Sequence, residues 1–402
     1  MSKLRLSRRN FLGASAAGGF AVSSALSEPG RAAAQAVGVK PADLPDLTIK
    51  EVKVYVMERG RLASVVTRSG IEGNYTLATR YFHPNWSNLG WLDYAKGVLV
   101  GKSALDLPAL TSQWEPQKRR LGQSSYASAI DNCLWDILGK AVGLPVYRIL
   151  GAYKDKVLAY ASSQHLKTVD DFVADVRKCK TQGFKAYKIH PPWLPNGGVD
   201  YKLDMEVAKA VRKEAGDDFL LLYDRVGAYT RYEAMEVGRL MDELKYVAYE
   251  DPIPTTDIDG NVELCKALNV PIHLGEFIFS PYSFAEYIRR GAVDVVRFIV
   301  DNIGGITGGM KVARLAECFG MECAPHNWGD ALDHAVHFHC ELAIPNNVWF
   351  EMTQPQGSSD RPYIKDKIRI DKDGYVPAPT KPGLGYEIDH NALDKLVKTV
   401  ER

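Results

Sequence analysis

A lysine and a histidine two residues apart have types and a spacing that could do chemistry. Lys188 and His190 lie in AYKIHPPW, residues 186–193, a segment that is otherwise apolar and aromatic and stops at two prolines. Residues i and i+2 of a β-strand point to one face, so these two basic side chains would converge. A lone pair of this kind is more often a solvated strand edge, and its meaning depends on the rest of the chain.

A second pattern consists of polar residues that close successive apolar runs at a nearly constant step. The step is 25 or 26 residues, and the residues are Asp224, Glu250, Glu276, Asp301, His326 and Glu351. One strand–helix unit per polar residue would give such a step, and the C-terminal ends of the strands of a parallel barrel meet around one cavity. The pattern therefore predicts that these side chains lie together.

The types of these residues indicate a metal-assisted proton transfer. Asp224, Glu250 and Glu276 would offer only oxygen, which suits a hard divalent cation such as Mg²⁺; without it, the three carboxylates would raise one another's pKa. Asp301 and His326 could form a carboxylate–imidazole pair that carries a proton.

Lys188 and His190 would lie on the opposite wall, one strand before the three acids. Bases on two sides of a cation suit abstraction of the proton next to a carboxylate, through an enediolate. A lysine beside other cations would have a lowered pKa and could act as the base.

Eight apolar runs separated by amphipathic stretches are the elements that must position these residues. The runs are KVLAYAS, AYKIH, FLLLYD, YVAYED, PIHLGE, DVVRFIVD, MECAPHN and NVWFEM. Their alternation with helical stretches predicts parallel β/α units that close into an α/β barrel. A doubly wound sheet would show a glycine-rich phosphate turn after an early strand, and no such motif is present.

An α+β region precedes the barrel. Residues 47–70 alternate as strands do, residues 71–100 show no clear periodicity and predict a loop, and residues 103–150 have helical spacing. We place this N-terminal domain at residues 46–155, the barrel at 156–370 and a C-terminal segment at 371–402.

The net charge and the cysteines of the chain argue against some classes of partner and site. The chain has 402 residues and a formal net charge of +1, which argues against a nucleic-acid partner. Its six cysteines are scattered without a C-x-x-C pair, so we expect neither structural zinc nor a disulfide framework.

Residues 1–36 resemble a twin-arginine export signal. Arg8 and Arg9 precede a small-residue apolar stretch that ends near an A-x-A-like cleavage site. We therefore expect a periplasmic protein without membrane association once this segment is removed.

The motifs together resemble the mandelate racemase branch of the enolase superfamily. They are AIDNCLWDILGKAVGLPVYRILG, a K-x-H at the family's K-x-K position, YD at 223–224, YEDP at 249–252, LGE at 274–276, VDNIGGITG at 300–308, PHN at 325–327 and KPGLGYEID near the C-terminus. The resemblance implies a modified (β/α)₇β barrel whose mouth is covered by the N-terminal domain, with the C-terminal segment returning to that domain.

The resemblance also implies roles for the residues. Mg²⁺ would bind Asp224, Glu250 and Glu276, and a His326–Asp301 dyad would be one acid/base. The other would be His190, with Lys188 as its electrostatic or proton-sharing neighbour, and which of these two takes the proton is left open. Glu351 would hydrogen-bond a carboxylate oxygen of the substrate, and Asn327 is a further candidate for substrate contact.

The substrate is expected to be a small carboxylate, and the chain is expected to form a homo-oligomer. Dehydration of an acid sugar to a 2-keto-3-deoxy acid is favoured; racemisation or epimerisation is the alternative within the family. The residues that replace the family's usual lid stretch include three weaker candidates for substrate contact, namely Arg80, His83 and Trp86.

Two alternatives lie outside this reaction. The stretch HAVHFH, residues 334–339, invites a zinc site, but the third histidine leaves the helix face of the other two, so helix packing and surface roles are favoured. A periplasmic sugar-acid binding protein or inactive relative would not need acid/base groups on both walls.

Overall fold

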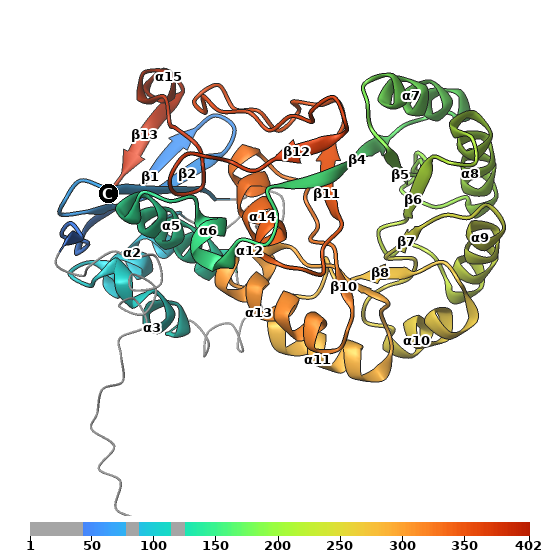
Figure 1. Cartoon of the computed structure of the whole chain (residues 1–402), viewed down its shortest axis with the longest axis horizontal. Coiled ribbons are helices and arrows are strands. Elements are labelled where there is room, and N and C mark those ends of the chain that lie inside the picture. The colour runs from blue at the N-terminus through green and yellow to red at the C-terminus, as the bar shows by residue number, and fades with distance from the viewer. Residues whose placement is uncertain (1–42, 78–87, 114–124) are drawn as a thin grey trace, which may run out of the picture.

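The computed structural model describes residues 43–77, 88–113 and 125–402. Two parts are apparent in Figure 1: a small sheet with β1, β2 and β13, and a barrel of strands with helices on its outside. Of the predicted features, the export signal and the three lid candidates Arg80, His83 and Trp86 lie outside the described residues. None of the helices within the described part is both long and apolar enough to cross a membrane.

The barrel confirms the predicted (β/α)₇β architecture. Its parallel strands follow one another in chain order from β4 to β10, and the last strand, β11, pairs with β4. The strands are β4 (Lys156–His165), β5 (Ala186–His190), β6 (Leu220–Asp224), β7 (Ala248–Glu250), β8 (Ile272–Leu274), β9 (Val295–Val296), β10 (Glu322–Cys323) and β11 (Trp349–Thr353). Each of the eight predicted runs contains or overlaps one of these strands.

Helices connect successive strands on the outside of the barrel. They are α7 (Val169–Thr181), α8 (Tyr201–Ala215), α9 (Arg231–Glu243), α10 (Ile258–Ala267), α11 (Pro281–Arg290), α12 (Val300–Ile303), α13 (Gly305–Cys318) and α14 (Ala331–Ala343). Most begin at a side chain that accepts a backbone N–H, which satisfies donors that the first helical turn leaves free. These capping residues are Thr168, Asp200, Thr230, Asp257, Ser280 and Asp330.

The alternation of side chains along β5 shows which way its basic side chains point. Ala186 packs with Tyr160, Leu222 and Ala248 in a small cluster inside the barrel. Tyr187 points outward, where its hydroxyl donates to Asp175 Oδ2 of α7 at 2.9 Å. Lys188 and His190 therefore share the inner face with Ala186, and every residue of β5 is buried, so β5 is no solvated edge.

The N-terminal domain is an antiparallel sheet with helices packed against it. The sheet has the order β13–β1–β2–β3, so the last strand of the chain completes it, as predicted. Its strands are β1 (Ile49–Met57), β2 (Arg61–Thr67), β3 (Glu72–Thr76) and β13 (Val397–Glu401). The helices before the barrel are α2 (Asn88–Leu99), the 3₁₀ helix η3 (Ala104–Asp106), α3 (Leu107–Ser112), α5 (Ser125–Val142) and α6 (Val146–Gly151).

The predicted loop over residues 71–100 is wrong, because β3 and α2 occupy much of it. Buried residues of α2 recur at helical spacing, at Trp91, Leu92, Ala95 and Leu99. Glycine and polar residues between them hid this period in the sequence.

The C-terminal segment contacts both parts of the molecule. Strand β12 (Tyr375–Pro377) pairs antiparallel with β4, so the chain still contacts the barrel beyond residue 370. Helix α15 (His390–Asp394) then leads into β13. The exact limits of the three predicted domains stay predictions.

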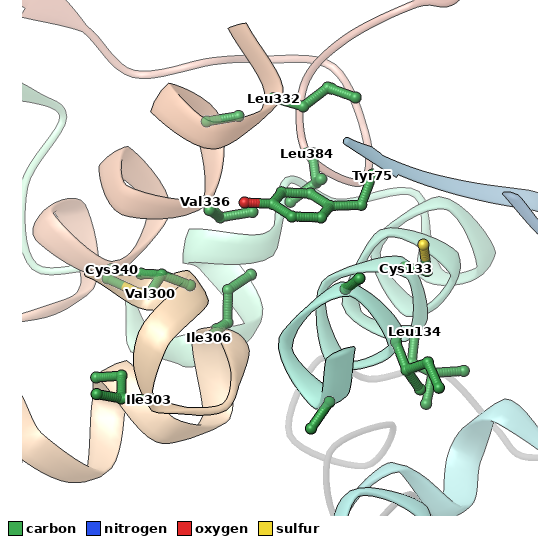
Figure 2. Packing of buried hydrophobic residues seen from close by; sticks show 14 of the residues in the cluster. Tyr75, Cys133, Leu134, Val300, Ile303, Ile306, Leu332, Val336, Cys340 and Leu384 are labelled. Carbon is green, nitrogen blue, oxygen red and sulfur yellow. The ribbon is translucent and has the colours of Figure 1, made fainter. Parts of the chain in front are cut away.

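One hydrophobic core joins the two parts. Tyr75 of β3, Cys133 and Leu134 of α5, and residues of α12, α13 and α14 belong to a single cluster of buried side chains (Figure 2). The N-terminal domain is therefore packed directly on the barrel helices that follow β9 and β10.

Helix α5 also supplies polar groups to the start of α13. Asp131 accepts from the Thr307 backbone N–H at 2.9 Å and from its hydroxyl at 2.5 Å. Asn132 accepts from the Ile306 N–H at 3.0 Å. At Gly305, where φ is +76°, an added Cβ would lie 2.4 Å from Asp131 Oδ2, so the close approach requires glycine. Side chains of α5 in the N-terminal domain thus cap helix α13 of the barrel.

We predict that Asp131→Ala lowers the free energy of unfolding by about 2–4 kcal/mol, because it leaves buried donors of α13 without an acceptor. Chemical denaturation measures this. The exposed Lys209→Ala on α8 serves as the control and should change stability by less than about 0.5 kcal/mol. A loss in Asp131→Ala no larger than that of the control would contradict the capping role.

Candidate active site

The predicted site residues come from the C-terminal ends of the barrel strands. Asp224 and Glu250 are the last residues of β6 and β7 and are direct neighbours in the register of the sheet. Glu276 lies two residues beyond β8 and His326 three residues beyond β10, while Glu351 lies within β11. The regular step in the sequence therefore did place these five residues at one end of the barrel.

Lys188 lies among three carboxylates. Its Nζ is 2.7 Å from Glu351 Oε1, 2.9 Å from Glu250 Oε2 and 3.4 Å from Asp224 Oδ2, and the side chain is fully buried. Burial and Arg297 act to lower the pKa of Lys188, but the carboxylates of Glu250 and Glu351 outweigh them and hold this pKa well above its ordinary value. The expectation of a neutral Lys188 amine is therefore wrong for this arrangement, because acids outnumber cations around it.

His190 is held at both ring nitrogens. Nδ1 lies 2.8 Å from the Ser163 carbonyl oxygen, and Nε2 lies 2.9 Å from Asp224 Oδ2. Since a carbonyl can only accept, Nδ1 carries a proton, and Nε2 is the nitrogen that can gain or lose one. The rings of Trp328 and His165 pack against the imidazole, with centroids 4.6 and 5.3 Å away.

His326 pairs with an acid, but not with the predicted one. Its Nε2 lies 2.8 Å from Glu276 Oε2. Burial lowers the pKa of His326 to about 3, and burial together with the Asp224 carboxylate raises the pKa of Glu276 to about 7. The imidazole and the carboxyl group thus lie in contact on the wall opposite His190.

Asp301 does not form the predicted dyad in this structure. It lies in α12 and not at the end of a strand, and no hydrogen bond joins it to His326 among the described residues. Instead, the Tyr75 hydroxyl lies 2.5 Å from Asp301 Oδ1. Burial raises the pKa of Asp301 to about 7. Asp301 therefore belongs to the contact between the N-terminal domain and the barrel.

Both carboxylate oxygens of Glu351 are contacted by hydrogen-bond donors. Lys188 and the Ser162 hydroxyl each lie 2.7 Å from Oε1, and the Asn327 N–H donates to Oε2 at 2.9 Å. Burial acts to raise the pKa of Glu351, but Lys188 and Arg297 hold it well below the ordinary value. The Asn327 side chain donates to the Glu351 carbonyl at 3.2 Å, so in this structure Asn327 braces Glu351.

Arg297 is a residue of this site that the sequence analysis missed. It follows β9 directly, is 1% exposed and contacts both Glu250 and Glu351. A signal existed in the sequence, because a basic residue inside the apolar run DVVRFIVD resembles Lys188 in AYKIH.

Two features of the site indicate whether these residues fit a divalent cation. One is a group with metal-ligand spacing, and the other is a buried carboxylate. Ligand atoms of Glu250, Glu276 and His326 all lie within 4.8 Å of one another. Asp251 is fully buried, and among the described residues neither of its carboxylate oxygens has a hydrogen-bond partner. Burial raises the pKa of Glu250 to about 7, and burial and Glu276 raise the pKa of Asp251 well above its ordinary value. Buried carboxylates crowded together with raised pKa values fit a hard cation.

The third predicted ligand, Asp224, lies beside this group and not within it. Its Oδ1 accepts from the Val226 N–H at 2.8 Å, and its Oδ2 faces His190. Burial acts to raise the pKa of Asp224, but Lys188 and His190 outweigh it and hold the pKa low. Asp224 is thus ionised next to the cluster, and its role as a ligand stays a prediction.

The histidines of HAVHFH have their own partners. His334 Nε2 lies 3.1 Å from the Ser359 hydroxyl, His337 Nε2 accepts from the Val300 N–H at 2.9 Å, and His339 Nδ1 accepts from the Tyr147 N–H at 3.0 Å. All three are buried in α14, so packing roles are confirmed and a surface role is wrong.

The barrel has a (β/α)₇β architecture, and acids and bases lie at its mouth beside the N-terminal capping domain. These features together are typical of one class of barrel enzymes. The family Mandelate racemase / muconate lactonizing enzyme, N-terminal domain, matches residues 61–151, and the Enolase C-terminal domain-like family matches residues 171–392. Since the second match alone covers more than half of the chain, the chain belongs to the enolase superfamily.

Several relatives are named as acid sugar dehydratases or as cycloisomerases. An arabinonate dehydratase of Saccharolobus solfataricus is 32% identical over 67% of this chain and 71% of its own length. A 3,6-anhydro-alpha-L-galactonate cycloisomerase of Streptomyces coelicolor is 28% identical over 75% of this chain and 81% of its own. The crystal structure of a D-glucarate dehydratase from Agrobacterium tumefaciens complexed with magnesium has a TM-score of 0.78 at 27% identity, covering 88% of this chain and all of that one.

We predict that Asp301 makes the protein less stable as the pH rises. Its pKa of about 7 exceeds the ordinary value of 3.8, so the stability that its protonation contributes is present below about pH 4 and is lost as the pH rises through 7. The expected loss is about 2–4 kcal/mol. In denaturation at pH 4.5 to 8 with EDTA, Asp301→Asn should lose less stability than the wild type over this range. The exposed Asp217→Asn is the control, and equal slopes in all three proteins would contradict the prediction.

Proposed function

We propose that the protein removes the proton next to the carboxylate of a small acid sugar and expels the β-hydroxyl, forming a 2-keto-3-deoxy acid. The observation that carries the proposal is the ligand-spaced group of Glu250, Glu276 and His326, with Lys188 and His190 on the other wall. A binding protein has no need of proton-carrying groups on both sides of such a group.

We propose that Mg²⁺ is the cofactor, held by Asp224, Glu250 and Glu276. When bound, it would offset the negative charge that develops on the substrate carboxylate as the α-proton leaves. The support is the metal-ligand spacing of Glu250 and Glu276, the position of Asp224 directly beside Glu250, and the magnesium complex of the related glucarate dehydratase.

His190 is assigned as the base that takes the α-proton. Its Nδ1 is committed to the Ser163 carbonyl, so Nε2 is the only atom that could accept, and it would do so once the Asp224 carboxylate that it faces is engaged as a metal ligand. Lys188 is assigned as the cation beside this base, because it lies between Glu250 and Glu351, which raise its pKa well above the ordinary value. It would stabilise the charge that proton removal creates.

His326 is assigned as the acid on the opposite wall. Its Nε2 lies at the mouth, 2.8 Å from Glu276, and from there a proton on Nε2 can pass to a departing β-hydroxyl, which leaves as water. Loss of the α-proton and the hydroxyl gives an enol, which becomes the 2-keto acid. Where no group can leave from the β-carbon, return of the proton would instead give racemisation or epimerisation.

We predict that His326→Asn and Glu250→Gln each lower turnover at least 10³-fold while the protein stays folded, since each removes a group that touches the reacting atoms or their cation. The assay screens mono- and diacid sugars with Mg²⁺ for keto-acid formation, and for α-deuterium exchange in D₂O. The exposed Lys209→Ala is the control. Full activity of either site variant would refute the role of that residue, and exchange without keto acid would favour the racemase alternative. Saturable binding without exchange across the panel would favour a binding protein.

We also propose that residues 1–36 direct export to the periplasm by the twin-arginine route, on the strength of Arg8 and Arg9 before the apolar stretch. In cell fractionation, the wild type should appear in the periplasm in a shortened form, and replacement of both arginines by lysine should keep it in the cytoplasm. A periplasmic double-lysine variant would refute the route. Assembly into a homo-oligomer is likewise proposed, and light scattering after size-exclusion chromatography tests it.

A further inference from the structure

Arg297 has an environment unlike that of the other arginines around the barrel, because it lies inside the mouth among the site's acids. Its Nη1 donates to the Ala324 carbonyl at 3.0 Å, and its Nη2 donates to the Tyr160 hydroxyl at 3.0 Å. Its Nε lies 2.5 Å from Glu250 Oε1, and Nη2 also pairs with Glu351 Oε2. All three guanidinium nitrogens are engaged, so the side chain is fixed in one orientation.

Arg297 and Lys188 together form a closed ring with two acids. Lys188 contacts Glu250 Oε2 and Glu351 Oε1, whereas Arg297 contacts the other oxygen of each carboxylate. Opposite charges therefore alternate around the ring, and all four side chains are at most 1% exposed. The two cations balance the two acids, so this part of the site is neutral before any metal binds.

This ring has a direct consequence for a divalent cation. Glu250 is both a ring member and one of the residues with metal-ligand spacing, so Arg297 already occupies one of its oxygens. A metal ion bound by Glu250 and Glu276 would lie close to the positive guanidinium, and like charges in a buried, weakly screened region repel strongly.

We propose that Arg297 is a positioning residue that sets the divalent-cation affinity of the site: it fixes Glu250 and weakens metal binding through its permanent charge. The inference rests on the metal-binding part of the proposed function. Loss of the charge should outweigh loss of the positioning contact, because Lys188 still holds Glu250 through Oε2. Removing Arg297 should therefore tighten metal binding.

The test measures Mn²⁺ binding to the full-length, EDTA-stripped protein by the electron paramagnetic resonance signal of free Mn²⁺ at low ionic strength and pH 8. Arg297→Met should bind Mn²⁺ at least tenfold more tightly than the wild type. Arg297→Lys keeps the charge and should stay within threefold of the wild type. Arg212→Met is the matched control, since Arg212 is also a largely buried arginine but donates to carbonyls of the segments that precede β6 and β7, at the opposite end of the barrel. Equal or weaker binding by Arg297→Met would overturn the inference.

Two provisions keep the test decisive if Arg297→Met does not fold. Arg297→Gln is a second neutral variant that retains a donor toward Tyr160, and it should show the same tightening. In wild-type protein with ¹⁵N-labelled arginine, saturation with Mg²⁺ should shift the Nε–H resonance of Arg297 and leave that of Arg212 unmoved; no shift would overturn the inference.

Neither readout requires turnover, so the inference can fail separately from the proposed function. Mn²⁺ binding of equal strength in the wild type and the neutral variants removes only the role of Arg297. No Mn²⁺ binding in any variant removes the proposed cofactor, and the inference with it.

Discussion

Burial of several carboxylates beside one another is the constraint on which the barrel mouth depends. Each of them is at most 3% exposed, and they are Asp224, Glu250, Asp251, Glu276 and Glu351. Unpaired charges in such a place would cost several kcal/mol each. The chain offsets this with two fixed cations, Lys188 and Arg297, and with a histidine on either side. Glu250 and Glu276 still keep raised pKa values, chiefly because they are buried.

The N-terminal domain is part of this arrangement, because it fixes the barrel segment that follows β9. Its helix α5 caps α13 through Asp131 and Asn132, and its strand β3 brings Tyr75 to Asp301. The Thr76 hydroxyl donates to Asp330, the capping residue of α14, at 2.7 Å. The end of β3 thus lies next to the barrel segments that follow β9 and β10.

The sequence predicts most of the barrel and the site because strand ends and polar residues coincide. Asp224 and Glu250 close their strands, and the pleat of β5 puts Lys188 and His190 on one face. The same logic fails at Asp301. The run DVVRFIVD suggests a strand up to this residue, but β9 ends at Val296 and a short helix begins at Val300. A spacing of about 25 residues cannot show whether a polar residue closes a strand or lies in a helix that begins shortly after the strand.

Other features of the site depend on contacts that no local pattern encodes. The pKa of Lys188 is set by acids from β7 and β11, which are far from it in the sequence, so expecting a neutral amine from neighbouring cations gave the wrong sign. His326 pairs with Glu276 and not with Asp301, since the N-terminal domain holds Asp301 through Tyr75. Arg297 could have been found from its position in an apolar run, but not its two acidic partners.

The central claim is that acids from three neighbouring strands share one divalent cation between His190 and His326. A crystal structure of the protein grown with Mn²⁺ and recorded near the manganese absorption edge tests this directly. The account predicts one strong anomalous peak within about 2.0–2.4 Å of oxygens from Asp224, Glu250 and Glu276. A crystal grown with Mn²⁺ that shows no peak there, or whose strongest peak lies at another group of side chains, would contradict the claim.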